Sequence, residues 1–258
     1  MSIPRLFVEH SLAAGEAIPA TPGQAHYLGQ VMRRAVGDAV LLFNGRDGEW
    51  QAAIASLRRD RATFLPNLRT RPQEAMADLR LLVAAVKRDA LEWVVEKATE
   101  LGVAVIQPVF TRRSVVGRVN ALRLVTIAQE AAEQCRRLTV PRIGPAASLH
   151  AVLEAWDGAP LLAGDETGQA PPIARVAKAM RLPLGWLVGP EGGFDPAELD
   201  DLRRRAFVST VGLGPRILRS ETAAVAGLAI LQSLAGDWNT ANLNTTDPAP
   251  GLSPAHSE

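Results

Sequence analysis

The chain has 258 residues, of which 47% are apolar and 21% charged, so it can bury a substantial core and is not a disordered protein. Its one cysteine, Cys135, excludes an internal disulfide and any metal site built from a cysteine pair. Residues 1–8 lack a signal-peptide pattern, and no apolar run reaches the roughly 18 residues of a membrane span. We therefore expect a soluble protein of the reducing cytoplasm, with no membrane partner.

The net charge of +1 is distributed unevenly along the chain. Residues 1–72 carry nine arginines against six acidic residues, and residues 79–142 carry eleven basic residues against six acidic ones. A positive surface on part of a near-neutral protein is typical of an enzyme that binds a polyanion. Ordinary solvated side chains explain the same numbers equally well, so charge alone leaves both interpretations open.

The first seventy residues have the pattern of a small β-barrel. The strands predicted there cover residues 39–43, 50–57 and 61–65. Asx-Gly pairs at residues 44–45 and 47–48 are tight-turn signals, and helical periodicity is weak throughout. We expect the barrel to end in a linker at residues 66–72, a polar stretch with proline at both ends.

From residue 79 onward the pattern changes to alternating strands and helices. Strands are predicted at residues 79–86, 103–106, 160–163, 185–188 and 206–211, and the last helix from about residue 221 to 238. One helix ends at Gly102, Asn120 caps a second, and Asp195 with Glu198 has the capping-box spacing for a third. The inner face of the second helix is predicted to consist of Leu124, Ile127, Ala128, Ala131, Cys135 and Leu138. This alternation predicts an α/β domain with a parallel sheet over residues 71–238, and residues 239–258 are predicted to be a disordered tail.

The first of two glycine-containing loops reads Gly-Pro-Glu-Gly-Gly at residues 189–193 and follows a predicted strand. Glycines adopt backbone conformations that other residues avoid, and they let a ligand approach the main chain. Open α/β sheets bind ligands at the carboxyl ends of their strands. These features favour a ligand-binding loop over a plain strand-to-helix turn, which needs only one or two glycines.

The second loop covers residues 211–223. Gly212 and Gly214 begin like a dinucleotide fingerprint, but Ile217 stands where the third glycine belongs, and no Walker lysine follows either loop. Nicotinamide and nucleoside triphosphate ligands are therefore excluded by spacing. Arg216 and Arg219 lie in an otherwise apolar stretch, which favours an anionic partner over the alternative of two surface charges.

Together the two loops resemble the paired signature of the RsmE family of SPOUT-superfamily RNA methyltransferases. The likeness is carried by residues 189–193 and by Leu-Gly-Pro-Arg-Ile-Leu-Arg-Ser-Glu-Thr-Ala at residues 213–223, with Ser220 where the family ordinarily has threonine. Further similar segments are residues 5–8, 26–33, 96–103 and 133–137. Cys135 and Arg136 depart from the family pattern, and the resemblance spans about residues 3–236.

This resemblance implies a PUA-like, RNA-binding β-barrel over residues 1–70 and a SPOUT α/β domain over residues 71–238 with a C-terminal trefoil knot, an exception to the rule against threaded chains. It implies S-adenosyl-L-methionine as cofactor, a homodimer and no metal. The implied reaction is methylation of N3 of one uridine of 16S rRNA, U1498 in the decoding region, within the assembled small ribosomal subunit.

The resemblance also implies which residues form the site. The cofactor-binding residues would be Leu162, Glu166, Leu187, Gly189, Pro190, Glu191, Gly192, Gly193, Leu213, Gly214, Ile217, Leu218, Thr222 and Ala223. The RNA-binding residues would be Arg5, His26, Arg33 and Arg137, of which His26 is either RNA-facing or structural.

The chemistry of the reaction indicates the catalytic residues. N3 lies on the pairing edge of uracil, so the base must be unpaired or flipped out. When N3 loses its proton, charge appears on O2 and O4, and a nearby arginine would stabilise that charge by about 3 kcal/mol. Arg216 and Arg219 are the candidates. Glu221 is a third candidate that could orient the target, although a helix N-terminal acid favoured by the dipole is an equal alternative.

Two other functions are compatible with the same motifs. A ribosome-assembly factor could use this fold to bind RNA without turnover, but it would have no need to keep intact loops at residues 189–193 and 213–223. A related SPOUT enzyme could act on transfer RNA or on a ribose hydroxyl. The product nucleoside discriminates between these enzymes.

Overall fold

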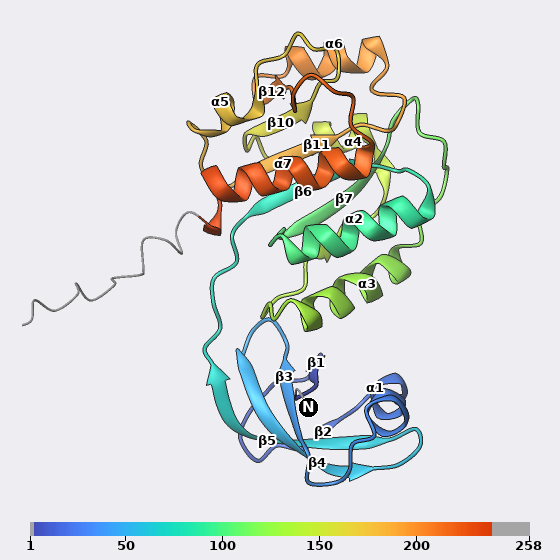
Figure 1. Ribbon diagram of the computed structural model, residues 1–258, viewed down its shortest axis with the longest axis vertical. Helices are drawn as coiled ribbons and strands as arrows, with labels where there is room; N and C mark the ends of the chain where they lie inside the picture. The colour runs from blue at the N-terminus through green and yellow to red at the C-terminus, as the bar shows by residue number, and fades with distance from the viewer. Residues whose placement is uncertain (1–2, 239–258) are drawn as a thin grey trace, which may run out of the picture.

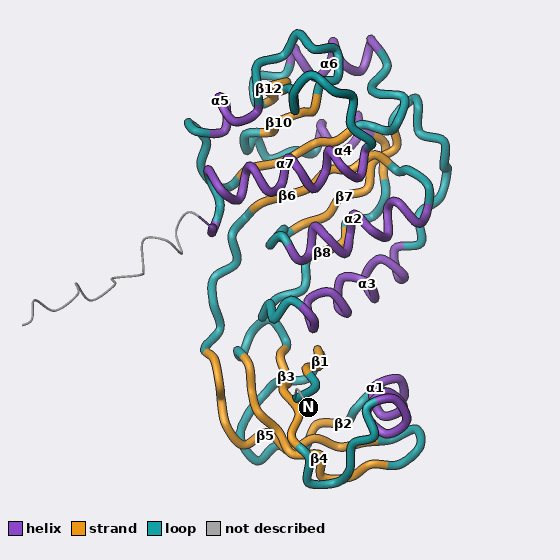
Figure 2. The backbone as a smooth tube through the Cα atoms, viewed as in Figure 1, coloured by secondary structure: helices purple, strands orange, loops and turns teal. Residues whose placement is uncertain are grey.

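The computed structural model describes residues 3–238, which form two units stacked along the long axis of the molecule (Figure 1). The first unit is almost entirely strand and loop, whereas helices surround the sheet of the second (Figure 2). The tail predicted at residues 239–258 lies outside the described residues.

The first unit is a curled five-stranded sheet with strand order β1-β3-β4-β5-β2. Its elements are β1 (Arg5–Phe7), β2 (Ile18–Pro19), α1 (Pro22–His26), the π-helical turn η1 (Tyr27–Val31), β3 (Ala39–Phe43), β4 (Glu49–Leu57) and β5 (Ala62–Arg71). β1 pairs with β3 in parallel, and the other pairs are antiparallel. Along β5 the side chains of Ala62, Phe64 and Pro66 alternate inward, as expected for a strand with one buried face.

The linker predicted at residues 66–72 is wrong, because β5 continues through it to Arg71. Pro66 lies opposite Ala52, next to a shift in the register of the β4–β5 ladder. A proline has no N–H to donate, so it is tolerated where a ladder is irregular. The Pro66 carbonyl still accepts a 2.9 Å hydrogen bond from the Gly15 N–H. The connection between the two units therefore consists of residues 72–78.

The second unit contains a seven-stranded, fully parallel sheet of order β12-β10-β11-β6-β7-β8, with β9 also paired to β7. Its strands are β6 (Leu79–Ala84), β7 (Val105–Phe110), β8 (Arg142–Ile143), β9 (Ala147–Ser148), β10 (Leu161–Gly164), β11 (Leu184–Val188) and β12 (Val208–Val211). Its helices are α2 (Arg88–Glu100), α3 (Ala121–Gln134), α4 (Leu149–Glu154), α5 (Ile173–Ala177), α6 (Pro196–Arg204) and α7 (Ser220–Leu234). The predicted α/β domain with a parallel sheet is confirmed.

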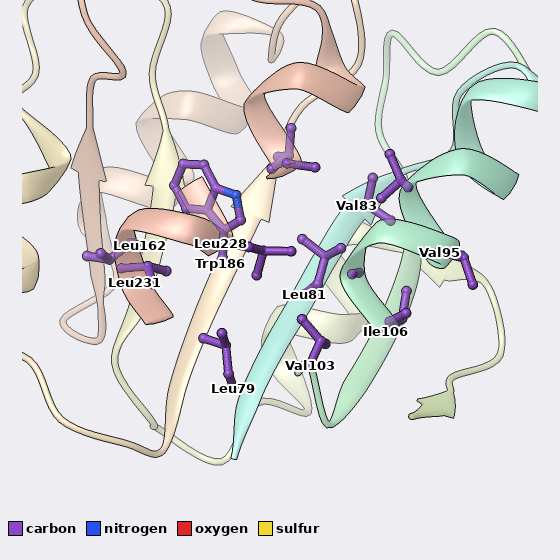
Figure 3. Close-up of a cluster of buried hydrophobic side chains, with 14 of the residues drawn as sticks. Leu79, Leu81, Val83, Val95, Val103, Ile106, Leu162, Trp186, Leu228 and Leu231 are labelled. Atoms are coloured by element: carbon purple, nitrogen blue, oxygen red, sulfur yellow. The ribbon is translucent and has the colours of Figure 1, made fainter. Parts of the chain in front are cut away.

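Each face of this sheet has its own apolar cluster. Residues of α2, α3, α5 and α7 pack on one face, and residues of α4 and α6 pack on the other. Trp186 of β11 is fully buried in the first cluster, beside Leu228 and Leu231 of α7 (Figure 3). A Cβ at Gly227 would overlap the indole, so glycine is what lets α7 lie this close to β11.

Two predicted helix ends are wrong. α3 ends at Gln134, and Cys135 is its C-cap. Arg136 has φ of +63°, a left-handed conformation that breaks the helical period, so Leu138 packs with Phe43 of the first unit instead of continuing the inner face of α3. The last helix, α7, ends at Leu234 before the predicted position, because Ala235 leaves the helical conformation with φ of −129°.

Candidate active site at the carboxyl edge of the parallel sheet

Three neighbouring strands, β12, β10 and β11, end at the carboxyl edge of the sheet, and the loops that follow them lie side by side there. Ala163 of β10 is in register with Leu187 of β11, and Gly164 with Val211 of β12. The loops that follow begin at residues 165, 189 and 212. Predicted site residues from distant parts of the sequence are therefore adjacent, at the edge where open α/β sheets bind ligands.

The loop after β11 is a tight turn. The Gly193 N–H donates a 2.9 Å hydrogen bond to the Pro190 carbonyl, which closes a β-turn over Glu191 and Gly192. Gly193 has φ of +69°, and a Cβ there would overlap the carboxylate of Glu166 from the loop after β10. Only glycine fits at this position, because the backbone is left-handed and the neighbouring loop lies against it.

Hydrogen bonds hold this turn at both ends. The Ser220 hydroxyl, at the start of α7, donates a 2.8 Å hydrogen bond to the Gly189 carbonyl. Arg113 Nη1, from the loop between β7 and α3, donates a 2.7 Å hydrogen bond to the Gly192 carbonyl. Sequence reasoning missed Arg113. A basic pair directly after a strand that ends at this edge was the available signal.

The carboxylate of Asp165 organises the loop after β10. It accepts a 2.8 Å hydrogen bond from the Thr167 N–H and forms a 2.9 Å ion pair with Arg203 of α6. Burial opposes ionisation of this carboxyl, but the Thr167 and Arg203 contacts outweigh it and hold its pKa below the usual range. Asp165 is therefore an ionised structural residue beside Glu166, which is exposed.

The loop after β12 presents its polar residues to solvent. Arg216 and Arg219 are exposed, and the guanidinium group of neither makes a hydrogen bond or an ion pair with another residue in the described part of the chain. Arg219 is the N-cap of α7, and Glu221 lies half-buried in the first turn of that helix. Ile217 is 81% exposed.

The remaining predicted cofactor residues differ in exposure. Leu162, Leu187, Pro190 and Gly193 are buried, and Gly189, Leu213, Leu218 and Ala223 are half-buried, whereas Glu166, Glu191, Gly192, Gly214 and Thr222 are exposed. All lie on β10, β11, the three loops or the first turn of α7.

Of the four predicted RNA-binding residues, His26 and Arg33 are exposed on the first unit. The structure places Arg5 and Arg137 at the junction between the two units, where neither is exposed, so their contact with RNA stays a prediction that the burial does not favour. Arg5 is 9% exposed and lies at the junction between the two units, where Nε forms a 2.6 Å ion pair with Glu49.

Backbone carbonyls accept hydrogen bonds from both arginines, from Arg5 across this junction and from Arg137 within the second unit. Arg5 Nη1 donates a 2.7 Å hydrogen bond to the carbonyl of Ala132, and its Nη2 donates to that of Arg137. Arg137 Nη1 in turn donates to the carbonyls of Thr99, at 2.7 Å, and Val103, at 3.0 Å. Burial lowers the pKa of both guanidinium groups. Carbonyl-bound, desolvated guanidinium groups hold the chain together and are not presented to a phosphate.

A cavity of about 1080 Å³ lies away from this edge, between the first unit and helices α2 and α3. Its lining includes Glu9, Asp89 and Glu130, whose charge disfavours a polyanion. Within the described residues there is no cluster of side chains suited to hold a metal ion, and no helix is long and apolar enough to cross a membrane.

The sequence matches the RNA methyltransferase domain family over residues 73–232 and the RNA methyltransferase PUA domain family over residues 21–66. The ribosomal RNA small subunit methyltransferase E of Rickettsia conorii is 32% identical over 236 residues, which cover 91% of this chain and 97% of the relative. The chain belongs to the RsmE family of RNA methyltransferases.

Solved structures of similar proteins agree with this family assignment. A ribosomal RNA small subunit methyltransferase E from Neisseria gonorrhoeae, bound to S-adenosylmethionine, is 28% identical with a TM-score of 0.82. The likeness covers 92% of this chain and all of that one. A methyltransferase from Legionella pneumophila, in complex with the same cofactor, is 26% identical with a TM-score of 0.81 over 91% of this chain and 99% of its own. As in the RsmE family, the first unit is a PUA domain, and the predicted PUA-like fold is confirmed.

Proposed function

We propose that this RsmE-family protein transfers the methyl group of S-adenosylmethionine to N3 of one uridine of 16S rRNA, the U1498 position, in the assembled small ribosomal subunit. The observation that carries the proposal is the glycine turn at residues 190–193. Arg113 bonds to this turn at Gly192, and Ser220 bonds to the residue before it, Gly189. The exposed side chains of Arg216 and Arg219 lie on the loop that leads to Ser220. Relatives named ribosomal RNA small subunit methyltransferase E, one of them crystallised with S-adenosylmethionine, support the cofactor and the substrate class.

The residues at the carboxyl edge fit such a cofactor. Gly214 has φ of +108°, and no heavy atom lies within 4 Å of the place that a Cβ would take, so a ligand can approach the backbone there. The loops at residues 189–193 and 213–218 offer main-chain donors and acceptors, and the neighbouring strands β10 and β11 carry the buried side chains of Leu162 and Leu187, one on each face of the sheet. When bound, S-adenosylmethionine supplies an electrophilic methyl group.

We further propose that these loops belong to a trefoil knot. Three contacts that tie separate segments together support it. Ser220 bonds to Gly189, Pro172 before α5 pairs in parallel with Gly212 after β12, and the Asp165 N–H donates to the Val211 carbonyl. These contacts bring the three loops together at one edge of the sheet, where a threaded chain would place them.

In the proposed mechanism, the two arginines stabilise charge on the target base. The uracil must leave its stack to bring N3 to the carboxyl edge of the sheet. As N3 loses its proton to solvent water, the guanidinium groups of Arg216 and Arg219 face the charge that develops on O2 and O4, an effect worth about 3 kcal/mol. Glu221, in the first turn of α7, orients the base. Exposed His26 and Arg33 of the PUA domain bind flanking RNA.

The proposed enzyme works in the cytoplasm as a homodimer. Ile217, which is 81% exposed between Arg216 and Leu218, would be covered by the cofactor or by the second copy in this arrangement.

A methylation assay with labelled S-adenosylmethionine tests the reaction. The substrates are small subunits that lack N3-methyluridine, naked 16S rRNA and transfer RNA, and the product is identified by nucleoside mass spectrometry. We expect N3-methyluridine on the subunit, and a rate about a hundredfold lower for Arg219→Ala. The matched control is Arg181→Ala, an exposed arginine before the amino end of β11. A different methylated nucleoside, or cofactor binding without any methylated product, contradicts the proposal.

A further inference from the structure

The loop between β7 and α3 reaches the carboxyl edge from a strand outside the three that form the site. Its residues 111–114 form a compact turn in which the Ser114 hydroxyl accepts a 3.0 Å hydrogen bond from the Thr111 N–H, and the Ser114 N–H donates to the Thr111 carbonyl at 3.1 Å. Arg112 and Arg113 are therefore presented on an ordered turn rather than on a loose loop.

This turn is attached to the N-terminus of α6. The Arg112 N–H donates a 2.8 Å hydrogen bond to Glu198, and Arg112 Nη1 lies 3.2 Å from Asp195. Asp195 and Glu198 are the two members of the α6 capping box, so they are held in place by the helix itself. The attachment aims the next side chain, Arg113, at the glycine turn.

Arg113 makes one hydrogen bond to that turn, at the Gly192 carbonyl. This carbonyl belongs to the second central residue of the 190–193 turn, and glycine at positions 192 and 193 leaves the turn with little stiffness of its own. A charge-assisted hydrogen bond from a guanidinium group selects one orientation of the Gly192–Gly193 peptide. The same orientation sets where the neighbouring main-chain groups point.

We propose that Arg113 is a positioning residue for cofactor binding: it fixes the 190–193 turn in its binding conformation through the Gly192 carbonyl, while Ser220 holds the preceding residue, Gly189. This inference rests on the proposed function, because it takes the turn as part of the S-adenosylmethionine site. The exposed Arg118 of the same loop serves as the comparison, since it carries the same charge without a bond to the glycine turn.

The test measures cofactor affinity separately from turnover. Isothermal titration of the full chain with S-adenosylhomocysteine is performed on the wild type and on Arg113→Ala, Arg113→Lys and Arg118→Ala, with thermal melts to compare stability. We expect Kd to rise about tenfold in Arg113→Ala and to recover largely in Arg113→Lys, whose ammonium can donate to the same carbonyl. Arg118→Ala is expected to keep the wild-type Kd, and the KM for the small subunit is expected to be unchanged in Arg113→Ala.

The contrary outcomes are distinct. An unchanged Kd with a raised KM for the subunit makes Arg113 an RNA contact and overturns the inference. Equal losses of affinity in Arg113→Ala and Arg118→Ala indicate a general charge effect and overturn it too. If the wild-type chain fails to bind S-adenosylhomocysteine, that result contradicts both the proposed function and the inference. If the wild type and Arg113→Ala bind S-adenosylhomocysteine with the same Kd, the inference about Arg113 is wrong and the proposed function stands.

Discussion

The Ser220 hydroxyl donates a 2.8 Å hydrogen bond to the carbonyl of Gly189, which joins the start of α7 to the end of β11. Ser220 is 3% exposed, so water cannot easily replace this bond. The contact gives the hydroxyl at this position a structural role.

Removal of this hydroxyl is therefore expected to loosen the proposed cofactor turn. Ser220→Ala should lower the free energy of unfolding by about 1 kcal/mol and weaken S-adenosylhomocysteine binding several-fold, because the Gly189 carbonyl loses its donor. Ser220→Thr keeps the hydroxyl and should behave like the wild type in both measurements, made by urea unfolding and titration calorimetry. Equal behaviour of the two variants would contradict this role.

Gly193 is expected to be the glycine least tolerant of substitution in the 190–193 turn. Gly193→Ala should destabilise the protein by about 1–2 kcal/mol from its φ of +69° alone, and its Cβ would also displace the Glu166 carboxylate. Gly192→Ala is the matched control, since the heavy atom nearest to its Cβ would be 3.8 Å away, on Arg113. Urea unfolding compares the two. In the double variant Gly193→Ala/Glu166→Ala, the overlap is relieved but the backbone strain stays, so recovery should be partial.

The junction between the two units should make stability depend on pH. Glu133 accepts a 2.9 Å hydrogen bond from the Phe7 N–H, but burial raises the pKa of its carboxyl to about 7 from 4.5. The folded state binds this proton more tightly than the unfolded state. The protonated Glu133 therefore makes its whole contribution to the free energy of unfolding below about pH 4.5, and that contribution is lost as pH rises through about 7. The loss is at most about 3 kcal/mol.

Glu133→Gln isolates this effect, because the amide oxygen still accepts from Phe7 but no longer titrates. Unfolding in urea at about pH 5 and about pH 8 should show a smaller loss of stability on going to high pH in the variant than in the wild type. Parallel pH profiles for the two proteins would rule out Glu133 as the titrating group.

Arg5 should prove to be a structural residue. Arg5→Ala leaves the Glu49 carboxylate, 6% exposed, without its ion-pair partner and should cost about 3–5 kcal/mol of stability. Arg5→Met combined with Glu49→Leu removes both charges and should recover much of that loss. Arg33→Ala is the contrasting variant: it should leave the melting temperature unchanged but weaken rRNA binding and reduce its salt dependence, measured by filter binding. If Arg5→Ala has wild-type stability, Arg5 is not a structural residue, and the predicted RNA contact becomes the better explanation of its presence.

Local rules of the chain were enough to predict much of this protein. The capping box of Asp195 and Glu198 and the Asn120 cap lie where the sequence indicates, because a cap depends on residues three positions apart. Five of the seven strands of the parallel sheet were predicted from apolar runs, whereas the two-residue strands β8 and β9 were not, and the two glycine loops were predicted from their spacing. Their shared location at one edge follows from the parallel topology alone.

Tertiary structure alone determined the contacts between residues that are far apart in the sequence. Arg5 and Arg137 have the sequence context of RNA-binding arginines, and only the folded structure shows that Arg5 donates to the carbonyl of Ala132 and Arg137 to those of Thr99 and Val103. Arg113 meets Gly192 across 79 positions of sequence, a contact that no local pattern encodes. The physical reason is the same in each case: a guanidinium group bonds to whatever acceptor the fold brings within about 3 Å, and that neighbour is set by packing rather than by the adjacent sequence.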